Sequence, residues 1–403
     1  MAKAAKQFIP QRTDELTASW FSDVLPFKGY VASVRIEDIG QDVGFIGEVY
    51  RCHLDWKAAG DEPLPLSVAG DEPLPLSVIV KVPTDNDENF AIGDGLQCYE
   101  REITVYQNLQ SSLGLPMPGF YYGAMDPDPA PWIEKPLLFL FDKLPIGGIN
   151  WLLKQFLKLA GNSKRRYVLV IEDIVGARPP TQAEGGSLDD ALAALKVLAR
   201  FHAHNWMRKE VIEDHHRLWP FDRACRAYQA SYVRNLDAFR KRYSGRLAAE
   251  TMHRLDEIQE RAADLNHELA GNPWTLLHGD YRLDNVLFRK GPDGSDELVV
   301  LDFQAMCHGR PGADVAYFVT TALTAEHRDK EDLLLHTYHD ELVASGVTNY
   351  SYDELVIDCT KAKEVYAHRI VGAADILDTE KTDGSEALLD VMQLRVLDWL
   401  EPA

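Results

Sequence analysis

Several short runs of mainly apolar, strand-like sequence alternate with glycines near the start of the chain. The runs are "VASVRIEDIG" (31–40), "EVYRCHLDW" (48–56) and "SVIVKVP" (77–83). They predict antiparallel strands of a meander. The next segment, 95–114, predicts a helix, because it carries apolar residues at helical spacing: Leu96, Tyr99, Ile103, Tyr106 and Leu109.

Two further strand-like runs, 119–126 and 166–174, flank a stretch that contains an amphipathic helix. The apolar side of that helix comprises Ile149, Leu152, Leu153, Phe156 and Ala160. It has two interpretations: a lid over an acceptor molecule, formed by Trp151 and Phe156, or ordinary packing against the smaller lobe.

Beyond residue 173 the pattern becomes mainly helical. Ser187 can cap a helix that follows it, and acidic residues stand in its first turn. Further helices are predicted around 222–242 and 247–270, and several more from about 315 onward. Short strand-like pieces lie between them: "TLLHGD", "NVLFR" and "LVVLDF".

This order of elements predicts an α+β protein of two lobes. A small lobe built on an antiparallel sheet with one main helix spans 1–172, with an insertion at about 136–162. A larger helical lobe spans 173–403. The decapeptide "AGDEPLPLSV" occurs twice in tandem, at 59–68 and 69–78. Because the second copy leads into a β-branched run, we expect a strand at 76–82 and a bulge at the first copy, which costs little stability.

Composition narrows the functional class. The chain has 403 residues, 46% of them hydrophobic, and a formal net charge of −21. An acidic chain argues against a nucleic-acid partner, which needs a basic surface. Five scattered cysteines favour free thiols over disulfides or a zinc site. With no visible signal peptide and no uncharged apolar run of about 18 residues, we expect a soluble, cytoplasmic protein without a membrane span.

Candidate chemistry begins in the predicted sheet. Gly44 and Gly47 lie between two strands, where backbone N–H groups can approach a phosphate, although glycines between strands are more often part of plain hairpin turns. Lys81 stands between valines in an apolar strand, and its charge there calls for an anion or for solvent. Glu100 and Glu102, on the following helix, are both candidates to pair with it.

The second group of candidates lies in "HGDYRLDN" (278–285) and "VVLDFQ". Asp280 precedes Asn285 by five residues, and Asp302 ends the next predicted strand. Phosphoryl transfer needs a group that orients the acceptor hydroxyl, ligands for Mg²⁺ and a cation over the phosphates. Carboxylate and amide oxygens suit Mg²⁺. A hairpin between the two motifs brings their ends together, so the pattern predicts a kinase-type site for ATP and Mg²⁺.

These motifs resemble the aminoglycoside phosphotransferase and choline kinase superfamily, and within it the ecdysteroid kinase-like branch. Other stretches carry the closer resemblance: "IPQRTDELTASWFSDVL", "GEVYRCHL", "YEREITVYQNL", "VLVIEDI", "LARFHAHNW" and "GRPGADVAYFV". The resemblance implies a protein-kinase-like fold and ATP-dependent, Mg²⁺-dependent phosphorylation of a hydroxyl group on a small molecule. It also suggests a steroid-like or other hydroxylated hydrophobic acceptor.

The resemblance also implies roles for individual residues. Asp280 is the expected catalytic base, and Asn285 and Asp302 are the expected magnesium ligands. Lys81, positioned by Glu102, is expected to hold the α- and β-phosphates.

The resemblance implies roles for further positions. The backbone of Glu172, Asp173 and Ile174 is expected to bind adenine. Arg282 is expected either to offset γ-phosphate charge or to form a structural ion pair. Asp314 is expected to brace the catalytic loop.

Some features limit the resemblance or leave alternatives open. Gly279 and Gln304 replace an arginine and a glycine of protein kinases, which argues against a protein kinase. His202 and His204 are two residues apart on a helix, which favours packing over metal binding. A nucleotide-binding pseudokinase and a kinase of hydroxyacyl thioesters remain alternative functions, and the acidic balance is compatible with a cationic acceptor.

Overall fold

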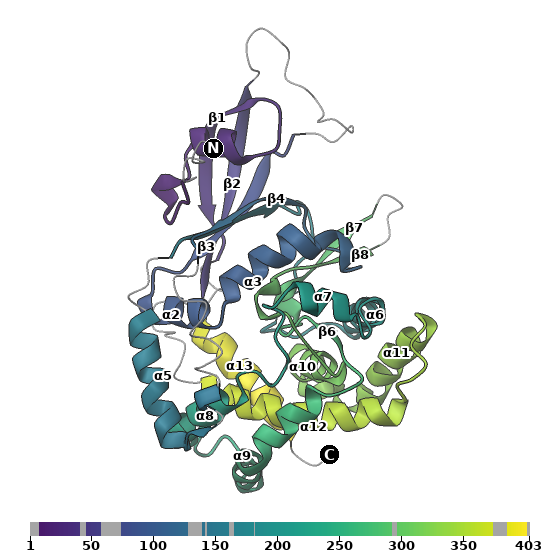
Figure 1. The fold of residues 1–403 in the computed structure, drawn as a ribbon. Helices are drawn as coiled ribbons and strands as arrows, with labels where there is room; N and C mark the ends of the chain where they lie inside the picture. The colour runs from purple at the N-terminus through teal and green to yellow at the C-terminus, as the bar shows by residue number, and fades with distance from the viewer. Residues whose placement is uncertain are drawn as a thin grey trace.

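The computed structural model describes residues 8–40, 46–57, 74–127, 139–141, 143–160, 165–180, 182–291, 296–373 and 385–400. Gly44, the first decapeptide copy and the start of the second, and the edges of the predicted insertion lie outside these ranges. Within them, two lobes are evident, a sheet at one end of the molecule and a larger group of helices at the other (Figure 1). The predicted α+β architecture is confirmed.

The small lobe is built on a five-stranded antiparallel sheet in the order β1-β2-β3-β5-β4. Its strands are β1 (Tyr30–Asp38), β2 (Gly47–Lys57), β3 (Ser77–Pro83), β4 (Phe120–Met125) and β5 (Tyr167–Glu172). The first three form the predicted meander, and the strand predicted at 76–82 is β3. The last strand in the chain order, β5, inserts between β3 and β4 and is buried through most of its length.

Alternation along β3 determines what each face of the sheet does. Val78, Val80 and Val82 point to one face, where they are buried with Trp20 and Phe21 of α1 (Ala18–Val24). Ile79 and Lys81 point to the opposite face, which lines a cleft. The apolar sequence on both sides of Lys81 therefore anchors the strand while the lysine projects toward the other lobe.

The helix predicted over 95–114 is divided. The chain forms α2 (Asp87–Gly95), passes through Gln97 in the left-handed region at φ 55°, and then forms α3 (Cys98–Thr104). A π-helical turn, Val105–Leu109, and a short 3-10 turn, Gln110–Ser112, complete the segment. Ile103, Tyr106 and Leu109 of the predicted apolar face are buried, but the spacing of apolar residues does not distinguish α-helical from π-helical turns.

The large lobe consists mainly of helices. They are α6 (Leu188–His204), α7 (Lys209–Asp214), α8 (Cys225–Arg242), α9 (Ala249–Leu269), α10 (Gly312–Ala322), α11 (Glu331–Ala344), α12 (Tyr352–Ala373) and α13 (Ser385–Asp398). The Ser187 hydroxyl accepts a hydrogen bond from the Asp190 N–H, as predicted for the α6 cap. Among the described helices, none is long and apolar enough to cross a membrane.

Short strands carry the predicted chemical motifs into the junction of the lobes. β6 (Thr275–Leu277) pairs with β9 (Cys307–Gly309), and β7 (Val286–Lys290) pairs with β8 (Asp296–Val300). The β7–β8 hairpin connects Asn285 to Leu301, whose N–H donates to the Asn285 carbonyl. The hairpin therefore brings the ends of the two motifs together, as predicted from their spacing.

The predicted amphipathic helix is α5 (Ile146–Ala160). Ile149 is fully buried and packs with Phe141 and with Ala230 of α8. The helix thus packs against α8 of the large lobe and also against α2 of the small lobe, and in Figure 1 it runs from α2 to α8 at the side of the molecule. Trp151 is 64% exposed, and the side chain of Phe156 lies outside the described part, so the lid remains a prediction.

Candidate active site

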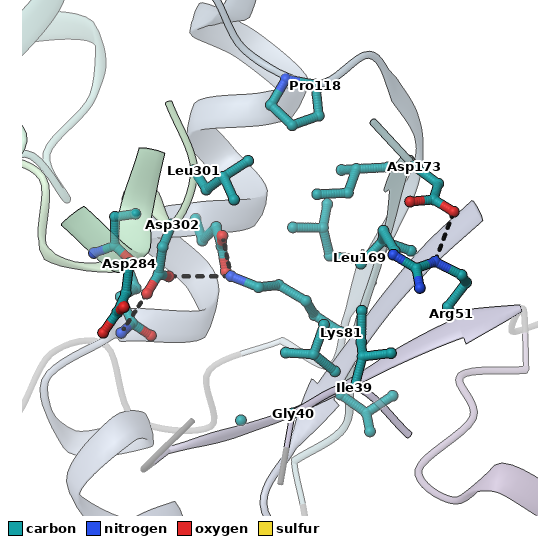
Figure 2. Close-up of a pocket in the computed structure, with 18 of the residues that line it drawn as sticks. Ile39, Gly40, Arg51, Lys81, Pro118, Leu169, Asp173, Asp284, Leu301 and Asp302 are labelled. Carbon is teal, nitrogen blue, oxygen red and sulfur yellow. Dashed lines mark hydrogen bonds and ion pairs between the residues drawn. The ribbon is translucent and has the colours of Figure 1, made fainter. Parts of the chain in front are cut away.

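Lys81 extends from β3 toward the other lobe and meets two carboxylates (Figure 2). Its Nζ lies 2.7 Å from Glu102 Oε1 and 3.1 Å from Asp302 Oδ1. Burial disfavours the ammonium charge, but the carboxylates of Asp302 and Glu102 outweigh it and raise the pKa of Lys81 above its usual value. Lys81 is therefore a permanent cation at the junction of the lobes.

The structure distinguishes the two glutamates that the sequence left as rivals. Glu102, on α3, pairs with Lys81, and burial raises its pKa although Lys81 opposes the shift. Glu100 instead pairs with Arg165 and Arg217, and its side chain is only 1% exposed. The rival thus holds α3 in place, while Glu102 faces the cleft.

The loop that carries Asp280 depends on a glycine. Gly279 has φ 80°, and a Cβ there would lie far inside contact distance of the Ala305 carbonyl oxygen. Only glycine fits this conformation without strain. An arginine, which protein kinases have at this position, would therefore not fit here.

Asp314 and His278 brace the same loop. Asp314, fully buried on α10, accepts hydrogen bonds from the His278 N–H at 2.6 Å and the Gly279 N–H at 3.0 Å. His278 Nδ1 accepts from the Asp280 N–H, so its Nε2 is left to donate to the Leu301 carbonyl at 2.9 Å. This bond links the Asp280 loop to the residue before Asp302, and the contacts of Asp314 agree with the structural role expected for it.

The Asp280 carboxylate has donors on both oxygens. Tyr317 Oη donates to Oδ1 at 2.9 Å, and Asn285 Nδ2 donates to Oδ2 at 3.0 Å. Arg282 Nε lies 3.4 Å from Oδ2. The carboxylate is thus fixed in one orientation at the wall of the cleft.

Asn285 and Asp302 form a donor set that fits a hard cation. Asn285 Nδ2 gives its hydrogens to Asp280, to the main-chain oxygen at 2.7 Å and to the carboxylate, which leaves Oδ1 as the available ligand. Asp302 has φ 65°, a sparsely populated conformation for a residue with a side chain, and such strain is common at functional sites. One amide and one carboxylate oxygen suit Mg²⁺, which usually keeps waters and phosphate oxygens as its other ligands.

Arg282 and Asp284 form an ion pair, and only Arg282 was predicted from the sequence. Arg282 Nη1 donates to Asp284 Oδ2 at 2.6 Å, and the Arg282 side chain is 7% exposed. The predicted structural ion pair is therefore present, and the guanidinium also lines the cleft. Asp284 was missed, although its place inside the motif beside Asn285 was the available signal.

The other end of the cleft is formed where β5 leaves the sheet. The Glu172 N–H donates to the Gly119 carbonyl, and the Glu172 side chain accepts from the Gly119 N–H. Asp173 Oδ2 accepts from Arg51 Nε at 2.8 Å and from Ser77 Oγ at 2.6 Å. These side-chain contacts fix the segment whose backbone is expected to bind adenine.

A single cleft of about 650 Å³ joins these groups. All predicted site residues line it except Gly44, which lies outside the described part: Gly47, Lys81, Glu102, Glu172, Asp173, Ile174, Asp280, Arg282, Asn285 and Asp302. Its wall also contains apolar side chains, among them Ile79, Leu169, Ile171, Leu287 and Leu301. This volume is typical of small-molecule and cofactor sites.

Charge in the cleft is unbalanced near Lys81. The carboxylates of Glu102, Asp280, Asp284 and Asp302 outnumber the cations Lys81 and Arg282. An anionic ligand would be repelled from this end unless added cations neutralised it. The imbalance therefore favours a divalent metal ion as a partner of any phosphate bound here.

The two histidines of α6 do not form a metal site. His202 Nδ1 bonds to Tyr338 Oη at 2.7 Å, and its Nε2 lies 3.3 Å from Asp314. His204 Nε2 bonds to the Ser112 carbonyl. Across the described ranges, no group of three His, Cys, Asp or Glu side chains is arranged to hold a metal ion.

Residues 153–348 match the model of the ecdysteroid kinase-like family. This stretch, a little under half of the chain, resembles that family. The match confirms the resemblance read from the motifs, and it includes Asp280, Asn285 and Asp302. Lys81, Glu102 and Gly47 precede the matched stretch.

One individual protein is similar to this chain over a short stretch of sequence. A mouse protein, acyl-CoA dehydrogenase family member 10, is 51% identical over 43 residues, which are 11% of this chain and 4% of that protein. The chain therefore spans only a small fraction of that relative.

Several solved structures are similar over most of the chain but at low identity. An APH(2″)-IIIa complex with GDP and kanamycin is 12% identical, covers 93% of this chain and 97% of its own, and has a TM-score of 0.49. A choline kinase of Cryptosporidium parvum Iowa II is 9% identical, covers 91% and 90%, and has a TM-score of 0.48. A Plasmodium vivax ethanolamine kinase is 10% identical, covers 91% and 82%, and has a TM-score of 0.46.

Proposed function

We propose that this protein transfers the γ-phosphoryl group of ATP to a hydroxyl group of a small molecule, with Mg²⁺ as the metal ion. One observation carries the proposal: Lys81 lies far from Asp280, Asn285 and Asp302 in the sequence, yet all four line one cleft. These are the side-chain types that phosphoryl transfer requires. Their joint presence also weighs against a pseudokinase, in which one of them is usually missing.

The nucleotide is proposed to lie along the cleft with adenine between the apolar wall residues and its edge at the Glu172–Ile174 backbone. Lys81, held by Glu102, binds the α- and β-phosphates. Gly47, at the start of β2, allows the backbone to approach the phosphates. In this arrangement the small lobe, 1–172, supplies the lysine, and the large lobe, 173–403, supplies the remaining acidic groups.

Asn285 Oδ1 and Asp302 are proposed to hold Mg²⁺, which when bound neutralises phosphate charge. Asp280 orients the acceptor hydroxyl and accepts its proton as the oxygen attacks the γ-phosphorus and ADP leaves. Arg282 is close enough to this carboxylate to offset charge on the transferred group, in addition to its pairing with Asp284.

The acceptor class is proposed from the family resemblance: a hydroxylated hydrophobic molecule. The experiment is therefore a screen in which ADP release from ATP is measured with pure protein, Mg²⁺ and a panel of steroid alcohols, amino alcohols, aminoglycosides and hydroxyacyl thioesters. Acceptor-dependent ADP release supports the proposal.

Asp280→Asn tests the role of the carboxylate while keeping its shape. We expect this variant to bind ATP but to lose ADP release by more than about a hundredfold, a typical loss when a general base is removed. The exposed Asp353, changed to Asn, is the matched control and should retain full activity. Turnover that persists in Asp280→Asn would reject the assignment, and ATP binding without any turnover in the unmodified chain would favour the pseudokinase.

A further inference from the structure

Tyr317 is the only tyrosine whose hydroxyl is hydrogen-bonded to Asp280 in the described part of the chain. Its Oη lies 2.9 Å from Asp280 Oδ1, whereas Asn285 and Arg282 approach Oδ2. Tyr317 therefore donates a hydrogen bond to the carboxylate oxygen that Asn285 and Arg282 do not contact.

The same helix supports the loop in a second way. Asp314 stands three residues before Tyr317 on α10, so both side chains lie on one helical face. Asp314 fixes the backbone N–H groups of His278 and Gly279, and Tyr317 reaches the side chain of the next residue, Asp280. One face of α10 thus sets both the path of the loop and the direction of its carboxylate.

Tyr317 is well suited to this task because it remains a donor. Burial and the nearby Asp280 charge raise the pKa of its phenol well above the usual value, so the hydroxyl keeps its proton. The ring is also fixed from behind, since it packs against Tyr366 with ring centroids 4.6 Å apart. A carboxylate oxygen has more than one acceptor direction, so an acceptor hydroxyl can bind Asp280 while Tyr317 stays in place.

We propose that Tyr317 is a positioning residue that orients the Asp280 carboxylate toward the acceptor hydroxyl. This inference rests on the proposed function, because it assigns Tyr317 to the same transfer step. Tyr317 itself exchanges no proton in that step. Its loss frees Asp280 Oδ1 and allows the carboxylate to rotate away from the productive direction, which slows transfer without touching the nucleotide contacts.

The test compares Tyr317→Phe with Tyr366→Phe. Both changes remove one hydroxyl from the same pair of packed rings, but the buried Tyr366 Oη has no hydrogen-bond partner within the described ranges. ADP release with water or any active acceptor and ATP affinity by calorimetry are measured for each. We expect Tyr317→Phe to lower kcat about tenfold, equivalent to about 1.4 kcal/mol, with ATP affinity unchanged. Tyr366→Phe should keep the kcat and ATP affinity of the unmodified chain.

Combining Tyr317→Phe with Asp280→Asn separates positioning from a general structural effect. If Tyr317 acts through the carboxylate, the double variant should have the same residual rate as Asp280→Asn, to within about twofold. A full additional tenfold loss, or a normal kcat in Tyr317→Phe, overturns the inference while leaving the proposed function intact. Absence of ADP release from the unmodified chain overturns the proposed function itself.

Discussion

Replacing Lys81 tests how far protein stability and ATP binding depend on the charge of this side chain. In Lys81→Met, Glu102 and Asp302 lose the ammonium that lies 2.7 Å and 3.1 Å from them. Methionine is one atom shorter than lysine but keeps an unbranched apolar stem, so the lost charge is the main change. We therefore expect lower stability as well as loss of ATP binding.

The size of the stability loss follows from burial. Breaking a fully buried ion pair costs about 3–5 kcal/mol, and an exposed pair contributes about 1 kcal/mol or less. The side chains of Lys81, Glu102 and Asp302 are 22%, 9% and 19% exposed, so the site lies between these limits. A loss of about 2 kcal/mol in the free energy of unfolding is expected at pH 7.5.

The loss should depend on pH with a definite sign. Burial raises the pKa of Glu102 in the folded protein, and the variant lacks Lys81, the largest influence that opposes this shift. A folded state that binds a proton more tightly than the unfolded chain gains stability as the pH falls. Lys81→Met should therefore be closer to the unmodified protein at pH 5 than at pH 7.5.

Urea denaturation followed by circular dichroism measures these differences, and a cycle with Glu102→Gln isolates the pair. Adding Glu102→Gln to Lys81→Met should recover part of the lost stability, since it removes the uncompensated charge. If Lys81→Met is as stable as the unmodified chain at pH 7.5, or if its loss grows at pH 5, the electrostatic account of this site is wrong.

Three further changes have defined outcomes. Gly279→Ala places a Cβ against the Ala305 carbonyl at φ 80°, so we expect a lower Tm and at least about a tenfold loss of ADP release, measured by calorimetry and coupled assay. His368→Gln should make the protein less sensitive to acid. Burial, and to a smaller extent Arg369, lowers the pKa of His368 to about 3, so below pH 6.5 the unfolded chain binds a proton that the folded chain does not. At pH 5 the unmodified protein should therefore lose about 2 kcal/mol of unfolding free energy that the variant keeps, as measured by urea titration. Ser187→Ala removes the hydroxyl that accepts from the Asp190 N–H at 3.1 Å and should cost about 1 kcal/mol at any pH in the same assay, with activity unchanged.

Local pattern was sufficient for most of the fold. The β-branched run at 76–82 predicted β3, and the cap at Ser187 predicted where α6 begins. The order of strands was beyond such reasoning, because β5 joins β3 and β4 through contacts between residues far apart in the sequence. The break at Gln97 was also missed, since a left-handed residue other than glycine leaves little trace in an apolar pattern.

In the site, too, local spacing predicted some residues, whereas residues placed by tertiary contacts were missed. Spacing within the "HGDYRLDN" motif and across the following hairpin was enough to expect Asp280, Asn285 and Asp302 together, and they line one cleft. Their roles remain predictions. Tyr317 and Asp284 were missed because their partners are set by tertiary contacts, and a tyrosine on a buried helix is more often a packing residue.

The most direct measurement of the central claim is a calorimetric titration of the pure protein with ATP, with and without Mg²⁺, repeated on Asp302→Asn and on the exposed control Asp237→Asn. The account predicts that ATP binds in the presence of Mg²⁺, that binding weakens sharply without it, and that Asp302→Asn loses the Mg²⁺ dependence while Asp237→Asn retains it. No ATP binding under any condition, or the same Mg²⁺-dependent affinity in Asp302→Asn as in the unmodified chain, would contradict it.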